Sequence, residues 1–582
     1  MSVDENKSNL DELKSRINDY LVILYPDYNP QIICDEIFHL MNYADNYHHA
    51  ETHTNLWSQT DIVTITYGDS IKADDELPLD TLHRFLKKHL DDVISTIHIL
   101  PFYPFSSDDG FSVINYAEVN QSLGDWKNIN NIANDFSLMA DLVINHCSSR
   151  SLWFDNYKQG KDPGSDYFIE IDPTVDLSEV VRPRTSPLLR ETETLDGTRH
   201  VWCTFSHDQV DLNFENPKVL LEFVKIIKLY LDNGVSLFRL DAVAFLWKNI
   251  TTPSINLPET HDVIRLLRLL IEHINPNAIV ITETNIPNKE NLSYFGNANE
   301  AHLIYNFTLP PLVLYTLLSG KSDLIKQWLM SMPPAQNGTT YFNFIASHDG
   351  IGLRPVEGIL SDETVDEIAE LMQSFGGDIS WRTLANGEHR PYELNISLID
   401  AFKGTFNGED EFQLNRFICA HAIMLALEGM PAFYIHSLFA TQNDHHKLNS
   451  TSNKRSINRH NWDYEQLNSL LANDTTIHSK AFTQLKHIIS LRKKQIALHP
   501  NATHFTMHIN DSIFAFWRQS QSRYQSIFCI YNITNQPQSI ALKDINLVEL
   551  DDWHDLISGH KYKDPRELII LQAYEYVWIT NN

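Results

Sequence analysis

Eight short β-rich runs, separated by helical stretches, make up most of the chain after about residue 61. This alternation is typical of parallel β-α units, because each parallel strand needs a crossover segment to return the chain to the same edge. Eight such units close most simply into a (β/α)8 TIM barrel, an α/β fold with its functional residues at the carboxyl ends of the strands. The predicted strands are Val63 to Tyr67, Thr96 to Leu100, Leu138 to Asn145, Val235 to Leu240, Ile279 to Glu283, Leu303 to Phe307, Tyr341 to Ala346 and Ala432 to Ile435.

Four segments do not follow this repeat. Residues 1–54 contain amphipathic helical patterns and are predicted to form an N-terminal helical cap, with Asn9 and Glu12 as a capping pair. Within a catalytic barrel of residues 55–500, two polar segments, 147–207 after the third strand and 350–395 after the seventh, are predicted as inserted domains on the C-terminal face. Residues 501–582 lose the helical periodicity, which predicts a C-terminal antiparallel β-domain.

The charge balance restricts the possible partners. The 75 acidic and 45 basic residues give a net charge of −30 at pH 7. Such a field repels phosphates and disfavours nucleic acid and anionic membranes, whereas a neutral sugar is indifferent to it. The acidic excess also keeps the surface solvated. An anionic co-substrate would need a local cluster of arginines.

The cysteines and the apolar runs bear on the compartment. The five cysteines are widely spaced and odd in number, which is typical of reduced thiols rather than a disulfide framework. The N-terminus has no apolar signal-peptide region, and no apolar run is long enough to span a membrane. These patterns predict a soluble, cytoplasmic protein.

The fourth predicted strand ends in Phe238-Arg239-Leu240-Asp241. Side chains two positions apart in a strand point to the same face, so Arg239 and Asp241 should stand side by side, with the cation keeping the carboxylate ionised. A lone R-x-D tripeptide is more often a structural pair than a catalytic one. Three further strand ends change the balance, because they also carry polar side chains suited to catalysis. They are Asp141 to His146, Ile281 to Asn285 and Ala346 to Asp349.

These four motifs, in this order, resemble those of the α-amylase family of glycoside hydrolases and transglycosidases. The resemblance implies that Asp241 is the nucleophile, Glu283 the general acid/base and Asp349 a third carboxylate that holds sugar hydroxyls. A retaining mechanism would place the carboxyl groups of Asp241 and Glu283 about 5 to 5.5 Å apart. Glu283 should have a raised pKa in a dry pocket beside other carboxylates.

The segment from Ile99 to Phe111 resembles the sucrose phosphorylase subgroup of this family. In that subgroup the position of Asp108 holds the outer hydroxyls of a terminal glucose, and the position of Phe111 packs on the sugar face. The pocket should therefore bind a short glucoside and not a polymer. The resemblance assigns substrate contacts to Asp108, Phe111, His146, Gln209, Arg239, His348 and Arg459.

Two inserted loops resemble the phosphate site of the same subgroup. Val181-Arg182-Pro183-Arg184 places Arg184 at the phosphate-binding position, and Tyr392 and Glu393 lie in the mobile phosphate-site loop. A guanidinium group suits a phosphate dianion because it can donate two parallel hydrogen bonds. Taken alone, an R-P-R tripeptide is usually a solvated turn.

Two departures refine the resemblance. Glu393 stands where sucrose phosphorylases have glutamine, and Thr282-Glu283-Thr284-Asn285 differs from their Glu-Val-His. Both details are more similar to glucosylglycerate phosphorylases, which implies cleavage of α-glucosyl glycerate by phosphate to α-glucose 1-phosphate and glycerate. One arginine could then hold either anion in turn. Glu393 would oppose both anions unless it binds hydroxyls or is itself paired.

Other readings stay open. Sucrose, sucrose 6-phosphate or glucosylglycerol phosphorylase activity differs by a few loop side chains, and a related α-glucoside hydrolase or transglucosidase differs only in what intercepts the glucosyl-enzyme. A non-enzymatic binding module is disfavoured because no catalytic carboxylate is missing. No cofactor is expected. We also expect no essential metal, because Ala244-Phe245 stands where amylases carry a calcium-associated Lys-His.

Overall fold

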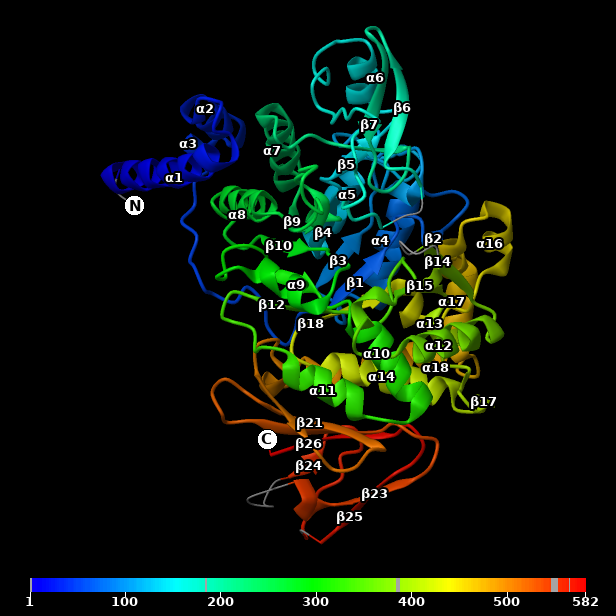
Figure 1. Cartoon of the computed structure of the whole chain (residues 1–582). Helices are drawn as coiled ribbons and strands as arrows, with labels where there is room; N and C mark the ends of the chain where they lie inside the picture. Colours follow the sequence, from blue (N-terminus) through cyan, green and yellow to red (C-terminus); the bar gives the residue numbers. More distant parts are fainter. Residues whose placement is uncertain (1–2, 184–185, 384–387, 546–552, 565, 582) are drawn as a thin grey trace.

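The computed structural model describes residues 3–183, 186–383, 388–545, 553–564 and 566–581. Eight parallel strands form a closed barrel in which each strand pairs with the next barrel strand along the chain (Figure 1). The strands are β1 (Val63–Thr66), β3 (Thr96–Ile99), β4 (Ser137–Leu142), β9 (Val235–Leu240), β10 (Ile279–Thr282), β11 (Leu303–Tyr305), β12 (Thr340–Asn343) and β18 (Met430–Tyr434). Each overlaps a predicted run, and the predicted barrel is confirmed.

Helices surround the barrel and bury its outer face. They include α4 (Pro78–His89), α5 (Trp126–Asp135), α7 (Pro217–Asp232), α8 (Pro258–Glu272), α10 (Leu309–Ser319), α14 (Gln413–Ala426) and α18 (Ile477–Arg492). Three of them, α4, α7 and α8, begin at a proline, which lacks an N–H that the first helical turn would leave unpaired. The strands are apolar runs buried on both faces because helices cover the outside and side chains fill the barrel.

Three N-terminal helices pack on the outside of the barrel, α1 (Val3–Leu24), α2 (Pro30–Met41) and α3 (Tyr43–Asn46). Helix α1 contacts α8 and α2 contacts α7, and the Tyr43 hydroxyl donates a hydrogen bond to the Leu270 carbonyl at 2.7 Å. The predicted capping pair at Asn9 and Glu12 is wrong. Helix α1 begins six residues earlier, because no proline or glycine interrupts the chain before Asn9.

Two insertions stand over the carboxyl ends of the strands. The first follows β4 and contains β5 (His146–Ser148), α6 (Leu152–Lys158), the hairpin β6 (Leu189–Thr194) and β7 (Gly197–Trp202), and β8 (Gln209–Asp211), which pairs with β5. The second follows β12 and forms a sheet of β13 (Ile351–Gly352), β15 (His389–Asn395) and β14 (Asp378–Thr383), beside α12 (Asp362–Ser374).

The C-terminal strands form a separate antiparallel sheet below the barrel. Its order is β20 (Thr503–Met507), β21 (Ile513–Gln519), β22 (Ser526–Asn532), β26 (Tyr576–Thr580) and β24 (His554–Asp555), with β23 (Gln538–Ala541) and β25 (Leu568–Leu571) paired beside it. Figure 1 shows this sheet at the opposite end of the molecule from the β6–β7 hairpin. It therefore lies far from the carboxyl ends of the barrel strands and supports the other end.

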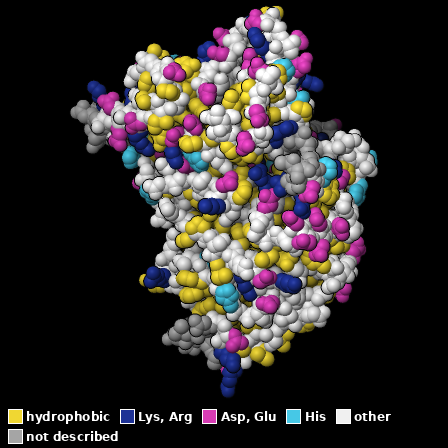
Figure 2. Space-filling view, in the orientation of Figure 1, with side chains coloured by type: hydrophobic (Ala, Val, Ile, Leu, Met, Phe, Trp, Pro, Cys, Tyr) yellow, Lys and Arg dark blue, Asp and Glu magenta, His cyan; other side chains and the backbone are white. Residues whose placement is uncertain are grey.

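Acidic residues outnumber basic ones in the chain by 75 to 45. Figure 2 shows Asp and Glu side chains spread over this face, with Lys and Arg scattered among them. Within the described ranges, no helix is long and apolar enough to cross a membrane.

Candidate active site

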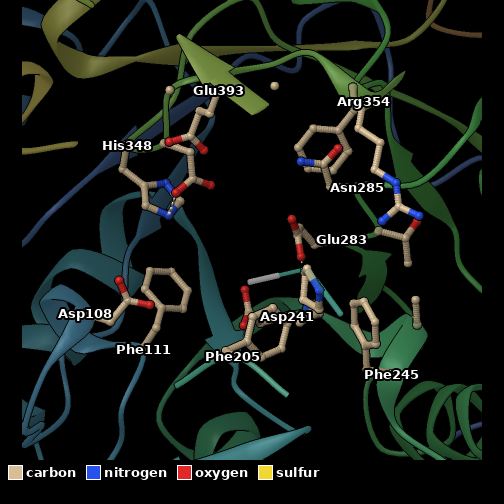
Figure 3. A pocket seen from close by; sticks show the side chains of 18 of the residues that line it. Asp108, Phe111, Phe205, Asp241, Phe245, Glu283, Asn285, His348, Arg354 and Glu393 are labelled. Atoms are coloured by element: carbon tan, nitrogen blue, oxygen red, sulfur yellow. Dashed lines mark hydrogen bonds and ion pairs between the residues drawn. The ribbon is translucent and has the colours of Figure 1, made fainter. Parts of the chain in front are cut away.

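A pocket of about 870 Å³, including space open to solvent, lies at the carboxyl ends of the barrel strands (Figure 3). The loops after the strands and both insertions contribute to its wall. Of the predicted site residues that the structure describes, all except Arg459 line it. Arg184 falls outside the described residues, so its predicted contact with phosphate stays a prediction.

Arg239 organises the floor of the pocket. Its side chain is 2% exposed at the end of β9, and its Nη1 donates a hydrogen bond to Asp241 Oδ1 at 2.7 Å. The same nitrogen pairs with Asp141, a fully buried carboxylate on β4 that also bonds to His98. Nη2 lies 3.8 Å from Glu283 Oε1. One guanidinium group therefore holds Asp241 and Glu283 in the same part of the site.

Asp241 and Glu283 share a buried environment. Burial raises the pKa of both carboxyl groups. The charge of Glu283 adds to this effect on Asp241, and the charge of Asp349 adds to it on Glu283, so each group retains a proton more readily than it would in water. The direct hydrogen bond from Arg239 opposes the effect of burial on Asp241 and favours its ionised form.

The backbone turn after the nucleophile candidate orients Glu283. Ala242 has a left-handed conformation with φ of 49°, unusual for a residue with a Cβ, and its N–H donates to Glu283 Oε2 at 2.9 Å. Local strain of this kind persists where the surrounding structure holds it, often at functional sites. The turn thus fixes one carboxyl oxygen of Glu283 and leaves the other toward the pocket.

Asp349 carries a stable negative charge. Burial alone would raise its pKa, but Arg455, His348 and Arg459 outweigh burial and leave the pKa well below its usual range. Arg455 Nη1 lies 2.5 Å from Asp349 Oδ1. Asp349 therefore accepts hydrogen bonds and does not act as an acid at neutral pH.

The pocket wall around Asp108 and Phe111 is suited to bind the face and outer hydroxyls of a sugar. Gln209 Nε2 donates to Asp108 Oδ2 at 3.1 Å, and the Phe111 ring stacks on His348 with centroids 5.1 Å apart. His146 Nε2 bonds to the Phe111 carbonyl at 2.9 Å. Burial lowers the pKa of His348 to about 3 and also lowers that of His146, so both rings are neutral at pH 7.

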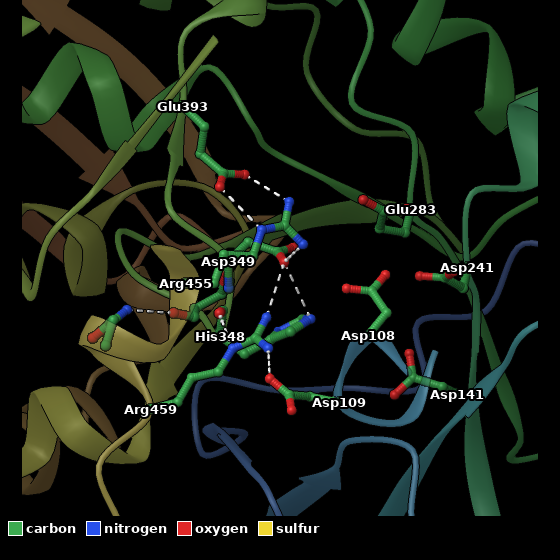
Figure 4. Close-up of polar contacts among 12 residues, drawn as sticks. Asp108, Asp109, Asp141, Asp241, Glu283, His348, Asp349, Glu393, Arg455 and Arg459 are labelled. Carbon is green, nitrogen blue, oxygen red and sulfur yellow. Dashed lines mark hydrogen bonds and ion pairs between the residues drawn. The ribbon is translucent and has the colours of Figure 1, made fainter. Parts of the chain in front are cut away.

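Glu393 is paired, which answers the question that its sequence position raises. Arg455 donates two hydrogen bonds to it, from Nε at 3.0 Å and from Nη2 at 2.7 Å (Figure 4). Gly350 permits this arrangement, because a Cβ there would lie 2.4 Å from the Leu394 carbonyl oxygen and 2.6 Å from Glu393 Cγ. Strand β15 can therefore approach the start of β13 closely and present Glu393 and Tyr392 to the pocket.

Arg459 lies behind the pocket wall. Its Nε donates to the His348 carbonyl at 2.8 Å, its Nη1 pairs with Asp109, and its Nη2 is 3.8 Å from Asp349. Its partner is thus Asp109 and not the neighbouring Asp108. The expected contact between Arg459 and glucose stays a prediction, while its observed contacts position the His348-Asp349 loop.

Comparison with known proteins places this site in a family. Residues 88–356 match the family model for the α-amylase catalytic domain. A glucosylglycerate phosphorylase of Spirochaeta thermophila is 40% identical over 529 residues, which cover 90% of each chain. The chain belongs to the glycoside phosphorylases of the α-amylase family.

Two further relatives support this placement. A glucosylglycerate phosphorylase of Allomeiothermus silvanus is 38% identical over 570 residues, covering 98% of this chain and 99% of the relative. The crystal structure of sucrose 6F-phosphate phosphorylase from Thermoanaerobacter thermosaccharolyticum has a TM-score of 0.72 at 24% identity and covers 83% of this chain and 96% of that one. The structural similarity supports the shared fold.

Several residues that line the pocket were given no role in it by the sequence analysis. Among them are Phe205, Phe245, Asn285, Arg354 and Arg455. Arg455 lies four positions before Arg459, a predicted substrate contact, and Arg354 follows Asp349 by five positions. Proximity to these motifs was the available signal. A single sequence gives no indication of which way such arginines point.

The prediction that no metal is needed stays a prediction. Across the described ranges, no cluster of three or more His, Cys, Asp or Glu side chains could hold a metal ion. The ammonium group of Lys248 instead lies between oxygen atoms, 2.6 Å from Asn145 Oδ1 and 2.7 Å from Asp211 Oδ2. The Lys248 side chain thus links the loop after β4 to strand β8 of the first insertion.

Proposed function

We propose that this protein is a retaining phosphorylase that converts 2-O-α-D-glucosyl-D-glycerate and inorganic phosphate to α-D-glucose 1-phosphate and D-glycerate. One observation carries the proposal. Three carboxyl groups, Asp241, Glu283 and Asp349, line one pocket of a chain that is 40% identical, over 90% of its length, to a glucosylglycerate phosphorylase.

The first step would form a covalent glucosyl-enzyme. A carboxylate oxygen of Asp241 attacks C1 of the glucosyl unit while the bond from C1 to the glycerate oxygen breaks, and Glu283 gives its proton to that oxygen. The direct hydrogen bond from Arg239 supports an ionised Asp241, and burial supports a protonated Glu283. Asp349 would accept hydrogen bonds from sugar hydroxyls while the sugar ring distorts toward the transition state.

The second step would return the enzyme to its starting state. A phosphate oxygen attacks C1 from the side that glycerate left, the ester bond to Asp241 breaks, and the Glu283 carboxylate takes up the phosphate proton. Two inversions at C1 give retention, so the product is the α-anomer. The glucose-binding contacts proposed for Asp108, Phe111, His146, Gln209 and His348 would persist through both steps.

The proposal extends to compartment and partners. All five cysteines are free and buried, which supports a reducing, cytoplasmic location. The net charge of −30 supports small molecules and not nucleic acid as partners.

Phosphate dependence tests the reaction. The purified protein is incubated with glucosylglycerate with and without phosphate, and glucose 1-phosphate and free glucose are measured separately. We expect glucose 1-phosphate only when phosphate is present. Release of glucose at the same rate without phosphate would identify a hydrolase. Reverse synthesis from glucose 1-phosphate, with glycerate, fructose, fructose 6-phosphate and glycerol offered in parallel, tests the acceptor.

A further inference from the structure

The proposed reaction needs a cation that receives anions in the acceptor half of the pocket. Both the departing glycerate and the entering phosphate are negative, and the pocket wall already carries Asp108, Asp349 and Glu393. The surrounding field of the protein repels anions as well. An anion can bind here only against a guanidinium group whose charge is not already neutralised.

Arg455 does not meet this condition. It donates two hydrogen bonds to Glu393 and lies 2.5 Å from Asp349, so one positive charge faces two negative ones (Figure 4). Glu393 is 2% exposed, so removing Arg455 from it would leave a buried charge without its partner. Arg239 is committed in the same way, to Asp141 and Asp241.

Arg354 is different. It lines the pocket, and none of the described residues forms an ion pair or a side-chain hydrogen bond with its guanidinium group. Asn285 lines the same pocket, and its Oδ1 is buried and has no hydrogen-bond partner among the described residues. Gly352 makes room for this amide, since a Cβ there would lie 3.2 Å from Asn285 Nδ2.

The position of Arg354 relative to Glu283 is informative. Figure 3 shows Asp108, Phe111 and His348 on one side of Glu283, and Asn285, Arg354 and Phe245 on the other. Glu283 is proposed to protonate the oxygen that joins glucose to its acceptor, so the acceptor must lie on the side away from the glucose contacts. Arg354 occupies that side.

We propose that Arg354 is the anion-binding residue of the acceptor subsite, and that it binds first the carboxylate of glycerate and then phosphate, assisted by the Asn285 amide. This inference rests on the proposed phosphorylase function. Carboxylate and phosphate both present two oxygens that match the guanidinium fork. Asn285 Nδ2 can donate to either anion, and Oδ1 can accept from a glycerate hydroxyl or from the P–OH of hydrogen phosphate.

The experiment compares Arg354→Gln and Arg354→Lys with wild type and with Arg390→Gln. Arg390 pairs with Asp362 on the second insertion and is not part of the pocket wall, so its variant is the matched control. For each variant the KM for phosphate in phosphorolysis and the KM for glycerate in reverse synthesis are measured. Hydrolysis of α-glucosyl fluoride, whose leaving group needs no anion subsite, reports on the glucose half of the pocket.

We expect Arg354→Gln to raise the KM for phosphate and for glycerate about 10- to 100-fold, the range for loss of a charge-assisted hydrogen bond. Arg354→Lys should recover part of the loss. Hydrolysis of α-glucosyl fluoride should stay within about twofold, which also shows that the variant folds. Arg390→Gln should match wild type in all three assays.

The outcomes separate this inference from the proposed function. If wild type does not need phosphate, the proposed function fails and the anion subsite fails with it. If wild type needs phosphate but Arg354→Gln binds both anions normally, only the Arg354 inference fails. An Arg184→Gln variant tested in parallel sharpens this result, because loss of anion binding there alone would place the subsite at Arg184. A phosphorylase that prefers another acceptor still tests Arg354 through the KM for phosphate.

Discussion

A single guanidinium group, that of Arg239, lies against both of the carboxyl groups proposed to act on C1 of the substrate. It donates to Asp241 and lies farther from Glu283, so its charge opposes the effect of burial by direct hydrogen bonding only at Asp241. Replacing Asp241 by Asn would remove the proposed nucleophile while leaving an amide of nearly the same shape.

We expect Asp241→Asn to lower kcat for phosphorolysis by about 10⁴-fold or more, as is typical when a covalent nucleophile is lost. Thermal unfolding of the variant should resemble that of wild type, which separates a chemical effect from misfolding. A variant with more than a tenth of wild-type turnover would exclude Asp241 as the nucleophile.

The pH dependence tests the acid role of Glu283. Burial raises its pKa, and the negative charge of Asp349 adds to this effect. An acid must be protonated to act, so kcat/KM for the natural glucoside should fall about tenfold per pH unit once the pH exceeds the Glu283 pKa. That limb should lie above the ordinary range for glutamate.

The control for this pH profile is a second substrate, α-glucosyl fluoride. Fluoride leaves without protonation, so glucosyl-enzyme formation from α-glucosyl fluoride should lack the alkaline limb. The same limb with both substrates would assign it to another group, and Glu283 would then not be the acid.

At the scale of elements, Lys248 joins three parts of the active face. It follows the short helix η2 (Val243–Phe245), its Nζ donates to Asn145 after β4, and it pairs with Asp211 on β8. Asp211 also accepts from the N–H and hydroxyl of Thr204. The inserted segment is thus attached to the barrel rim through a buried charge.

We expect Lys248→Met to destabilise the fold by about 3–5 kcal/mol, because it leaves the buried Asp211 carboxylate without a cation. Its thermal unfolding midpoint should fall clearly below that of Lys14→Met, which removes the exposed pair with Asp35 and a contact with the Phe38 ring and should cost only about 1 kcal/mol. Equal midpoints for the two variants would show that the buried pair contributes no more than a surface pair.

At the scale of the whole molecule, the sequence predicted the repeated strands of the barrel and the polar residues that follow their ends. All eight barrel strands lie where the β-rich runs predicted them, and Asp241, Glu283 and Asp349 follow strand ends that face one pocket. The partner of Glu393 could not be predicted, because Arg455 lies 62 positions away and only tertiary packing brings them together. The start of α1 was also missed, since a capping pattern does not exclude a helix that begins earlier.

The C-terminal sheet appears in the sequence as a separate β-rich segment, yet its side chains complete the core of the barrel. Phe514, Phe516 and Trp578 belong to the same apolar cluster as the barrel helices, and the Tyr531 hydroxyl donates to the Ala422 carbonyl of α14 at 3.0 Å. Arg518 also donates to the Ala426 carbonyl at 2.6 Å. Because α14 is buried along most of its length, this sheet covers apolar surface that would otherwise face water.

A chain that ends after Pro500 should therefore fail to fold, although every proposed catalytic residue precedes that point. We expect the truncated protein to be insoluble or to lack cooperative thermal unfolding, because α14 would expose its apolar face. The full-length variant Tyr531→Phe removes only the two hydrogen bonds of one hydroxyl, to the Ala422 carbonyl and from Trp578 Nε1, so it should remain folded and active with a loss of about 1–3 kcal/mol. A truncated chain that is soluble, unfolds cooperatively and retains phosphorolysis would show that the barrel closes its core without the C-terminal sheet.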